Sequence, residues 1–184
     1  MKKTSYLFCV FLFFGLFLNT ASIANNQLKS LNLDELFSLL KAETDEKKAR
    51  KYENQIWQIW LKPKNEKING LMNDAYYFRK ELNITSALES LNEIISKEPN
   101  YAEAWNQRAI AYYYQNKFDL ALVDIEKTLE LEPRHFGAMA GRAVIYLRKN
   151  KHDLAKASIK QALEIHPFLQ ERELFPELNE KNNN

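Results

Sequence analysis

The sequence contains one cysteine and four glycines in 184 residues, and both shortages limit what it can form. The cysteine, Cys9, lies in an apolar N-terminal run, so a chain that has lost this run has no thiol for a disulfide. No segment shows, between turn signals, the alternation of apolar and polar residues that a half-buried strand requires. Helical periodicity dominates from Leu31 to Leu163. We therefore expect an all-α protein that is stabilised by packing alone.

The chain also lacks an excess of either charge. It carries 26 Lys and Arg against 24 Asp and Glu, and removal of Lys2 and Lys3 with the N-terminal run leaves 24 of each. Nucleic-acid binding needs surplus basic residues that neutralise phosphates, and electrostatic attachment to a membrane needs basic segments. We expect neither nucleic acid nor a charged membrane surface as a partner.

Motifs for catalysis and for metal or cofactor binding are missing from the sequence. It has no G-x-S-x-G, no phosphate-binding glycine loop and no H-E-x-x-H. Its three histidines, His135, His152 and His166, fall at opposite ends of the expected helices and cannot meet at one ion. We predict no catalytic residues, no cofactor and no metal, and a protein that is not an enzyme.

Residues 1–24 have the order of a secretory signal peptide. Two lysines precede the apolar run Tyr6–Leu18, and Ser22 and Ala24 supply the small residues that precede a cleavage site. The run is too short for a membrane-spanning helix, which needs about 20 apolar residues. We expect cleavage after Ala24, no membrane span in the mature chain, and a periplasmic location.

A period of 34 residues organises the remaining chain. Six columns keep their residue character through three copies: Ala75, Ala109 and Ala143; Phe78, Tyr112 and Tyr146; Ala87, Ala121 and Ala155; Leu91, Ile125 and Ile159; Ile95, Leu129 and Leu163; Pro99, Pro133 and Pro167. Small alanines let two helices approach closely, and each proline ends a unit because it cannot continue a helix. Asn116 and Asn150 fall at the turn between the helices, where left-handed geometry favours Asn. The first copy has Leu82 there, so we expect its turn to differ.

These columns resemble the tetratricopeptide repeat (TPR), a hairpin of two antiparallel helices, with Trp105 at its large apolar position. The resemblance implies a right-handed α-solenoid with three repeats, at residues 68–101, 102–135 and 136–169. Three such hairpins can bury a continuous core, because each repeat covers its neighbour.

The segments that flank the repeats are less regular. Residues 25–67 read as a degenerate N-terminal helical hairpin and linker, in which Asn32 and Glu35 form a capping pair. Residues 170–184 read as a partial C-terminal cap and tail, since Pro176 interrupts any long capping helix.

Two stretches, Trp105–Tyr114 and Glu132–Gly141, also resemble a family of secreted TPR proteins of Gram-negative bacteria, in which an aromatic helix such as Ile56–Leu61 precedes the repeats. That family has no assigned activity. The resemblance therefore implies the fold and a periplasmic location and leaves the partner open.

In TPR proteins, fixed positions of the first helix of each repeat line the concave face. The resemblance implies the following candidate partner-binding residues: Met72, Tyr76, Arg79, Asn106, Ile110, Tyr113, Tyr114, Leu147 and Arg148. Mixed aromatic, apolar and basic groups are typical of peptide-binding patches, although the tyrosines could instead pack against the N-terminal hairpin. The basic clamp that holds acidic chaperone C-termini is absent, because its positions carry Met72, Tyr76, Gly137 and Gly141.

Two further pairs have alternative interpretations. Arg108 and Arg142 occupy equivalent, usually apolar positions, and we expect internal ion pairs there in preference to binding of a ligand carboxylate.

Trp57 and Trp60 lie on a helix that is apolar nearly all round. This helix either packs between its partner and the first repeat or offers a surface to another chain, since exposed tryptophans anchor interfaces.

We expect a periplasmic adaptor or scaffold that binds a protein or peptide partner through its concave groove. The alternative is a structural subunit that assembles with itself or with an envelope complex through the Trp57/Trp60 hairpin or the C-terminal edge. The oligomeric state, which distinguishes the two, is left open by the sequence.

The signal sequence generates a prediction about the mature N-terminus. The protein recovered from the periplasm should begin at Asn25, as judged by the mass of the intact chain. A chain that starts at Met1 in the membrane fraction would contradict export by a cleaved signal.

Overall fold

The computed structural model describes residues 31–62 and 65–178, and within these ranges it is built of helices without strands. The expected signal peptide, residues 1–24, lies outside the described residues. The helices are, in chain order, α2 (Leu33–Ala42), α3 (Glu46–Trp60), α4 (Glu66–Lys80), α5 (Ile84–Lys97), α6 (Ala102–Tyr114), α7 (Phe118–Leu131), α8 (Phe136–Arg148), α9 (His152–Ile165) and the short 3-10 helices η1 (Gln170–Leu174) and η2 (Pro176–Leu178). None of the helices described is long and apolar enough to span a membrane.

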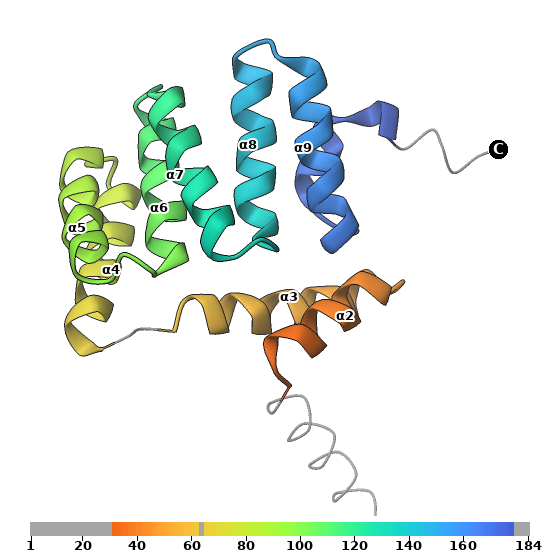
Figure 1. Cartoon of the computed structure of the whole chain (residues 1–184), viewed down its shortest axis with the longest axis horizontal. Coiled ribbons are helices and arrows are strands. Elements are labelled where there is room, and N and C mark those ends of the chain that lie inside the picture. The colour runs from red at the N-terminus through yellow and green to blue at the C-terminus, as the bar shows by residue number, and fades with distance from the viewer. Residues whose placement is uncertain (1–30, 63–64, 179–184) are drawn as a thin grey trace, which may run out of the picture.

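Helices α4 to α9 form three antiparallel hairpins, α4 with α5, α6 with α7 and α8 with α9, that stand side by side (Figure 1). The alanines of the 34-residue period lie where the helices of a hairpin meet: Ala87, Ala121 and Ala155 are fully buried. The predicted all-α solenoid is confirmed. The small side chains at these contacts explain it, because a larger group would push the two helices apart.

The turns inside the three hairpins are alike, which corrects the expectation for the first. Leu82, Asn116 and Asn150 all adopt a left-handed conformation, with φ of 58°, 56° and 56°. Each turn closes with a backbone hydrogen bond of 2.8–2.9 Å that reaches back five residues, as from the N–H of Asn83 to the carbonyl of Phe78. The packing of the hairpin therefore imposes the turn even on a leucine.

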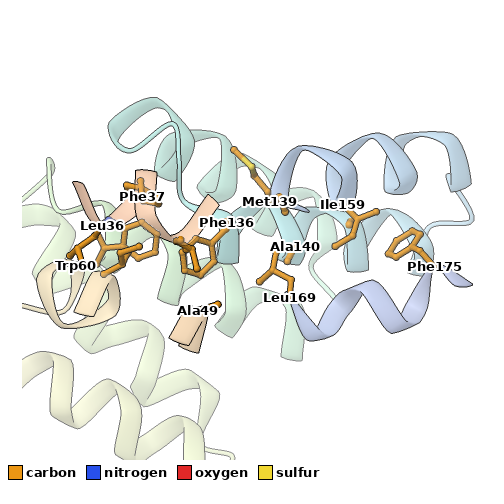
Figure 2. Close-up of a cluster of buried hydrophobic side chains, with 14 of the residues drawn as sticks. Leu36, Phe37, Ala49, Trp60, Phe136, Met139, Ala140, Ile159, Leu169 and Phe175 are labelled. Carbon is orange, nitrogen blue, oxygen red and sulfur yellow. The ribbon is translucent and has the colours of Figure 1, made fainter. Parts of the chain in front are cut away.

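The N-terminal hairpin occupies a different place from the one predicted. Helices α2 and α3 do not continue the stack beside α4; they lie across the ends of the later repeats (Figure 1). Their apolar side chains, among them Leu36, Phe37 and Trp60, form one buried cluster with Phe136 and Ile159 of the third repeat (Figure 2). The expected position between α2 and the first repeat is wrong, because the apolar face of α3 is buried against α8.

Contacts at both ends stabilise this arrangement. Asn32 and Glu35 form the predicted capping box at the start of α2. Arg134, in the loop before α8, pairs with Asp34 at 2.5 Å and lies 4.3 Å from the centre of the Phe37 ring. After α9 the chain turns into η1 and η2, where Phe175 is 2% exposed and closes the far side of the same cluster.

Leu82 yields a prediction for stability. A left-handed conformation costs an L-residue roughly 1–2 kcal/mol and costs asparagine less, and the Leu82 side chain is 75% exposed, so little packing is lost on its replacement. Leu82→Asn should raise the free energy of unfolding by about 0.5–1 kcal/mol in urea denaturation. The reverse change at the equivalent position, Asn116→Leu, should lower it by a similar amount; equal effects of the same sign would contradict the common turn geometry.

Candidate functional site

An apolar groove lies between α6 and α8, the first helices of the second and third repeats. It has a volume of about 220 Å³ and is open to solvent. We refer to it as the α6–α8 groove, and its lining residues are Asn106, Ala109, Ile110, Tyr113, Ile125, Gly137, Gly141, Val144, Ile145 and Glu171. Its lining is mostly aliphatic, with an amide, a phenol and a carboxylate as polar groups.

Two glycines of α8 line this groove. Gly137 and Gly141 stand one turn apart on the same helix face, where the second repeat carries Glu103 and Gln107. Neither glycine has a positive φ, so the backbone does not require them. A glycine inside a helix is about 0.5–1 kcal/mol less favourable than alanine. Packing, and not backbone conformation, therefore explains why positions 137 and 141 carry glycine.

The two glycines have different roles. A Cβ on Gly137 would lie 3.0 Å from Cη2 and 3.2 Å from Cζ2 of Trp57, so the indole of the N-terminal hairpin rests on that glycine. A Cβ on Gly141 would meet only Ile125, at 3.8 Å. Gly137 accommodates Trp57, whereas Gly141 leaves the groove open.

Trp57 is held by aromatic neighbours. Its ring centre lies 5.1 Å from Trp60, 5.6 Å from His135 and 5.5 Å from Phe136, each at nearly a right angle. Trp60 in turn stacks on His135 at 4.1 Å with an angle of 6° between the rings. Edge-to-face and stacked pairs are favourable aromatic geometries, and together they fix the indole at one end of the groove.

A second, polar hollow of about 280 Å³ adjoins that end and shares Gly137 and Glu171 with the groove. We call it the vestibule, and it is lined by Arg50, Glu53, Trp57, Phe136, Gly137, Leu169, Gln170 and Glu171. The N-terminal hairpin and η1 thus both contribute to the site, although they lie far apart in the chain.

A buried hydrogen-bond network lies below the groove. Glu103 is 1% exposed and accepts hydrogen bonds from Gln107 Nε2 at 2.5 Å and from Asn106 Nδ2 at 3.3 Å. His135 accepts the Ala138 N–H at Nδ1, so Nε2 carries the ring proton and donates to Glu103 Oε2 at 3.0 Å. A buried carboxylate is tolerated only when it is satisfied in this way. The network fixes Asn106 on the groove floor.

The buried charge of Glu103 also acts on two tyrosines. Burial and this charge together raise the pKa of Tyr101 to about 12 and raise that of Tyr76 further. Gln107 extends the network by accepting a hydrogen bond from Arg79 of the first repeat. One set of polar contacts therefore connects the three repeats, and Trp60 of the N-terminal hairpin stacks on His135 of this set.

Glu53 links α3 to the end of α9. Its carboxylate lies 3.1 Å from Nε2 of the fully buried His166 and 2.9 Å from Nη1 of Arg50. Burial by itself would raise the pKa of Glu53, but the contacts with His166 and Arg50 outweigh it and lower the pKa to about 2. The charged carboxylate therefore stabilises the docked hairpin.

The structure gathers only part of the predicted contact set. Asn106, Ile110 and Tyr113 line the α6–α8 groove. Met72 is 4% exposed and packs in the core of the first repeat, outside this groove. Whether the three groove residues contact a partner stays a prediction.

The other predicted contacts lie outside the groove. The guanidinium of Arg79 lies 5.3 Å from the centre of the half-buried Tyr76 ring and donates to Gln107. Leu147 packs against the cluster between the third repeat and the N-terminal hairpin. Tyr114 is 55% exposed, and the Arg148 guanidinium lies 5.8 Å from the Phe118 ring.

The expectation of internal ion pairs for the equivalent arginines is confirmed. Arg108 binds Asp124 through two hydrogen bonds of 2.8 Å, and Arg142 pairs with Glu126 at 2.8 Å.

The alternative that the two tryptophans offer a surface to another chain is weakened, because Trp60 is 8% exposed and Trp57 packs inside the chain. Among the residues described, no cluster of three or more His, Cys, Asp or Glu could hold a metal ion.

Sequence comparison now identifies the repeats. Models of the tetratricopeptide repeat match residues 102–135 and 137–168. A TPR repeat-containing protein of Rhizobium etli is 38% identical over 94 residues, which is 51% of this chain and 46% of the relative. Residues 102–168 of this chain are therefore tetratricopeptide repeats. It spans about half the length of this curated relative.

Solved TPR structures share the fold at low sequence identity. The first TPR domain of RPAP3, bound to the HSP90 peptide SRMEEVD, is 19% identical, covers 66% of this chain and 98% of its own, and has a TM-score of 0.59. MamA is 20% identical, covers 83% of this chain and 86% of its own, and has a TM-score of 0.51. These likenesses concern the fold alone.

The two glycines of α8 generate a paired prediction. Gly141→Ala should raise the free energy of unfolding by about 0.5–1 kcal/mol, because a helix former enters free space. Gly137→Ala should lower it by about 1–3 kcal/mol, because its methyl group displaces the packed Trp57 indole. Thermal and urea denaturation would measure both. Equal stabilisation by the two changes would show that Trp57 does not rest on Gly137.

Glu53 generates a prediction about pH. Since its pKa is lower in the folded chain than in the unfolded one, its contribution to stability is complete above about pH 4.5 and is lost as the pH falls toward 2. Glu53→Gln should therefore be less stable than the wild type at pH 7, with a difference that shrinks on acidification. Glu46→Gln, which changes an exposed partner of the same Arg50, is the control and should show a small difference at every pH.

Proposed function

We propose that this chain is a non-catalytic adaptor that holds a segment of a partner protein in the α6–α8 groove. The observation that carries the proposal is the open space over Gly141, which is kept at the expense of helix stability on the face formed by the first helices of the repeats. The floor of the groove consists of buried aliphatic side chains and the fixed amide of Asn106. Such a floor suits one apolar side chain of the partner segment and the partner's backbone beside it. The RPAP3 domain, which was solved with a bound HSP90 peptide, supports the same use of the fold.

The adaptor is further proposed to work in the periplasm. Support comes from the basic start, the short apolar run and the small residues before Asn25. The absence of cysteine after Cys9 fits such a location, since the chain needs no redox chemistry to fold there.

The groove can be tested before the partner is identified. A photo-crosslinking p-benzoylphenylalanine at Tyr113, in the groove, should give a discrete adduct in the native cells. The same group at Val123, which is 63% exposed on α7, is the control and should give none. Gly141→Leu, which fills the groove with a side chain, should abolish the Tyr113 adduct while helical content and melting temperature are kept.

Two results would contradict the proposal. One is an adduct that forms equally from Val123 and Tyr113, which would place the partner elsewhere. The other is a Tyr113 adduct that survives in folded Gly141→Leu, since the partner would then not need the space over α8.

A further inference from the structure

The end of the groove next to the vestibule carries a carboxylate, that of Glu171. Glu171 of η1 lines both the groove and the vestibule, and among the described residues no cationic group lies within ion-pair distance of it. The other charges of the vestibule are compensated: Arg50 pairs with Glu46 and Glu53, and Glu53 also contacts His166. Among the described residues that line the two hollows, Glu171 therefore carries a charge without an ion pair.

Apolar surface lies directly beside this carboxylate. Gly141 leaves the groove open next to the buried side chains of Ile125 and Ile145, and Trp57 lines the vestibule. A basic side chain near Trp57 would gain both the opposite charge of Glu171 and the aromatic face of the indole. An acidic group there would meet the like charge of Glu171, and the guanidinium of Arg50, the basic group lining the vestibule, is already paired with Glu46 and Glu53.

We propose that the α6–α8 groove accepts a partner segment in which an aliphatic or aromatic side chain is closely followed by a lysine or arginine. The apolar side chain sits over Gly141 and Ile125, and the basic side chain pairs with Glu171. This inference rests on the proposed function and adds the chemistry of the occupant. It predicts a preference opposite to the acidic sequence SRMEEVD of the peptide bound by the RPAP3 domain.

The probe for this inference is a library of random twelve-residue peptides displayed on phage and selected on the purified protein. Selected sequences should pair an apolar residue with a nearby Lys or Arg. Synthetic peptides from the selection should bind Glu171→Gln about three- to tenfold more weakly, as expected for one partly exposed charge pair. Added salt should weaken binding to the wild type more than binding to Glu171→Gln, because salt screens the charge pair.

A matched control is available on the same 3-10 helix. Glu173 is exposed and does not line the groove, so Glu173→Gln should bind these peptides as the wild type does. Glu171→Lys should reverse the preference toward peptides with an acidic residue at the basic position. Equal loss in Glu171→Gln and Glu173→Gln would indicate a general charge effect and would overturn the inference.

The remaining outcomes separate this inference from the proposed function. Loss of binding to Gly141→Leu or Ile110→Glu would show that a peptide needs the open groove. If such peptides bind Glu171→Gln as strongly as the wild type, or are themselves acidic, the inference is overturned and the groove remains the binding site. Peptides that bind every groove variant unchanged, or a selection that yields no groove-dependent peptide, would contradict both.

Discussion

The structure depends on the contact between the Trp57 indole and the bare backbone of Gly137. This contact, at 3.0 Å from the position of a Cβ, lets α3 approach α8 closely enough to bury Phe136, which is 1% exposed. Without it the apolar face of the N-terminal hairpin would need another cover. The docked hairpin in turn buries His135, whose ring completes the hydrogen bonding of Glu103. One close approach therefore determines both the hydrophobic cluster and the polar network.

The same contact gives the groove its shape. A regular TPR array leaves its face open at both ends, whereas here Trp57 and η1 form a wall where the third repeat begins. Gly141 keeps the space next to that wall free, and Asn106 is held on the floor by the buried carboxylate of Glu103. A site with fixed walls loses little conformational entropy when it binds, which favours selective recognition of a short segment.

The sequence predicted the repeats because each of their contacts is local and recurs every 34 residues. The alanine columns, the left-handed turns at Asn116 and Asn150 and the ion pairs of Arg108 and Arg142 all follow from that period. The place of the N-terminal hairpin could not be predicted in this way, since it rests on contacts between residues far apart, such as Asp34 and Arg134. A sequence signal did exist: two glycines, Gly137 and Gly141, four residues apart in a chain with only four. Glu171 gave none, because a carboxylate after the last repeat resembles ordinary solvated charge.

The most direct test of this account is an NMR measurement on the Gly137 α protons. With the Trp57 ring against them, one α proton should be shifted strongly upfield by the ring current and should show a nuclear Overhauser effect to Hη2 of Trp57. Replacement of Trp57 by leucine should return that proton to an ordinary shift. Gly137 α protons at ordinary shifts in the wild type, with Overhauser effects from Trp57 to Ile68 or Leu71 of α4 in their place, would show that the hairpin stacks on the first repeat and would contradict the account.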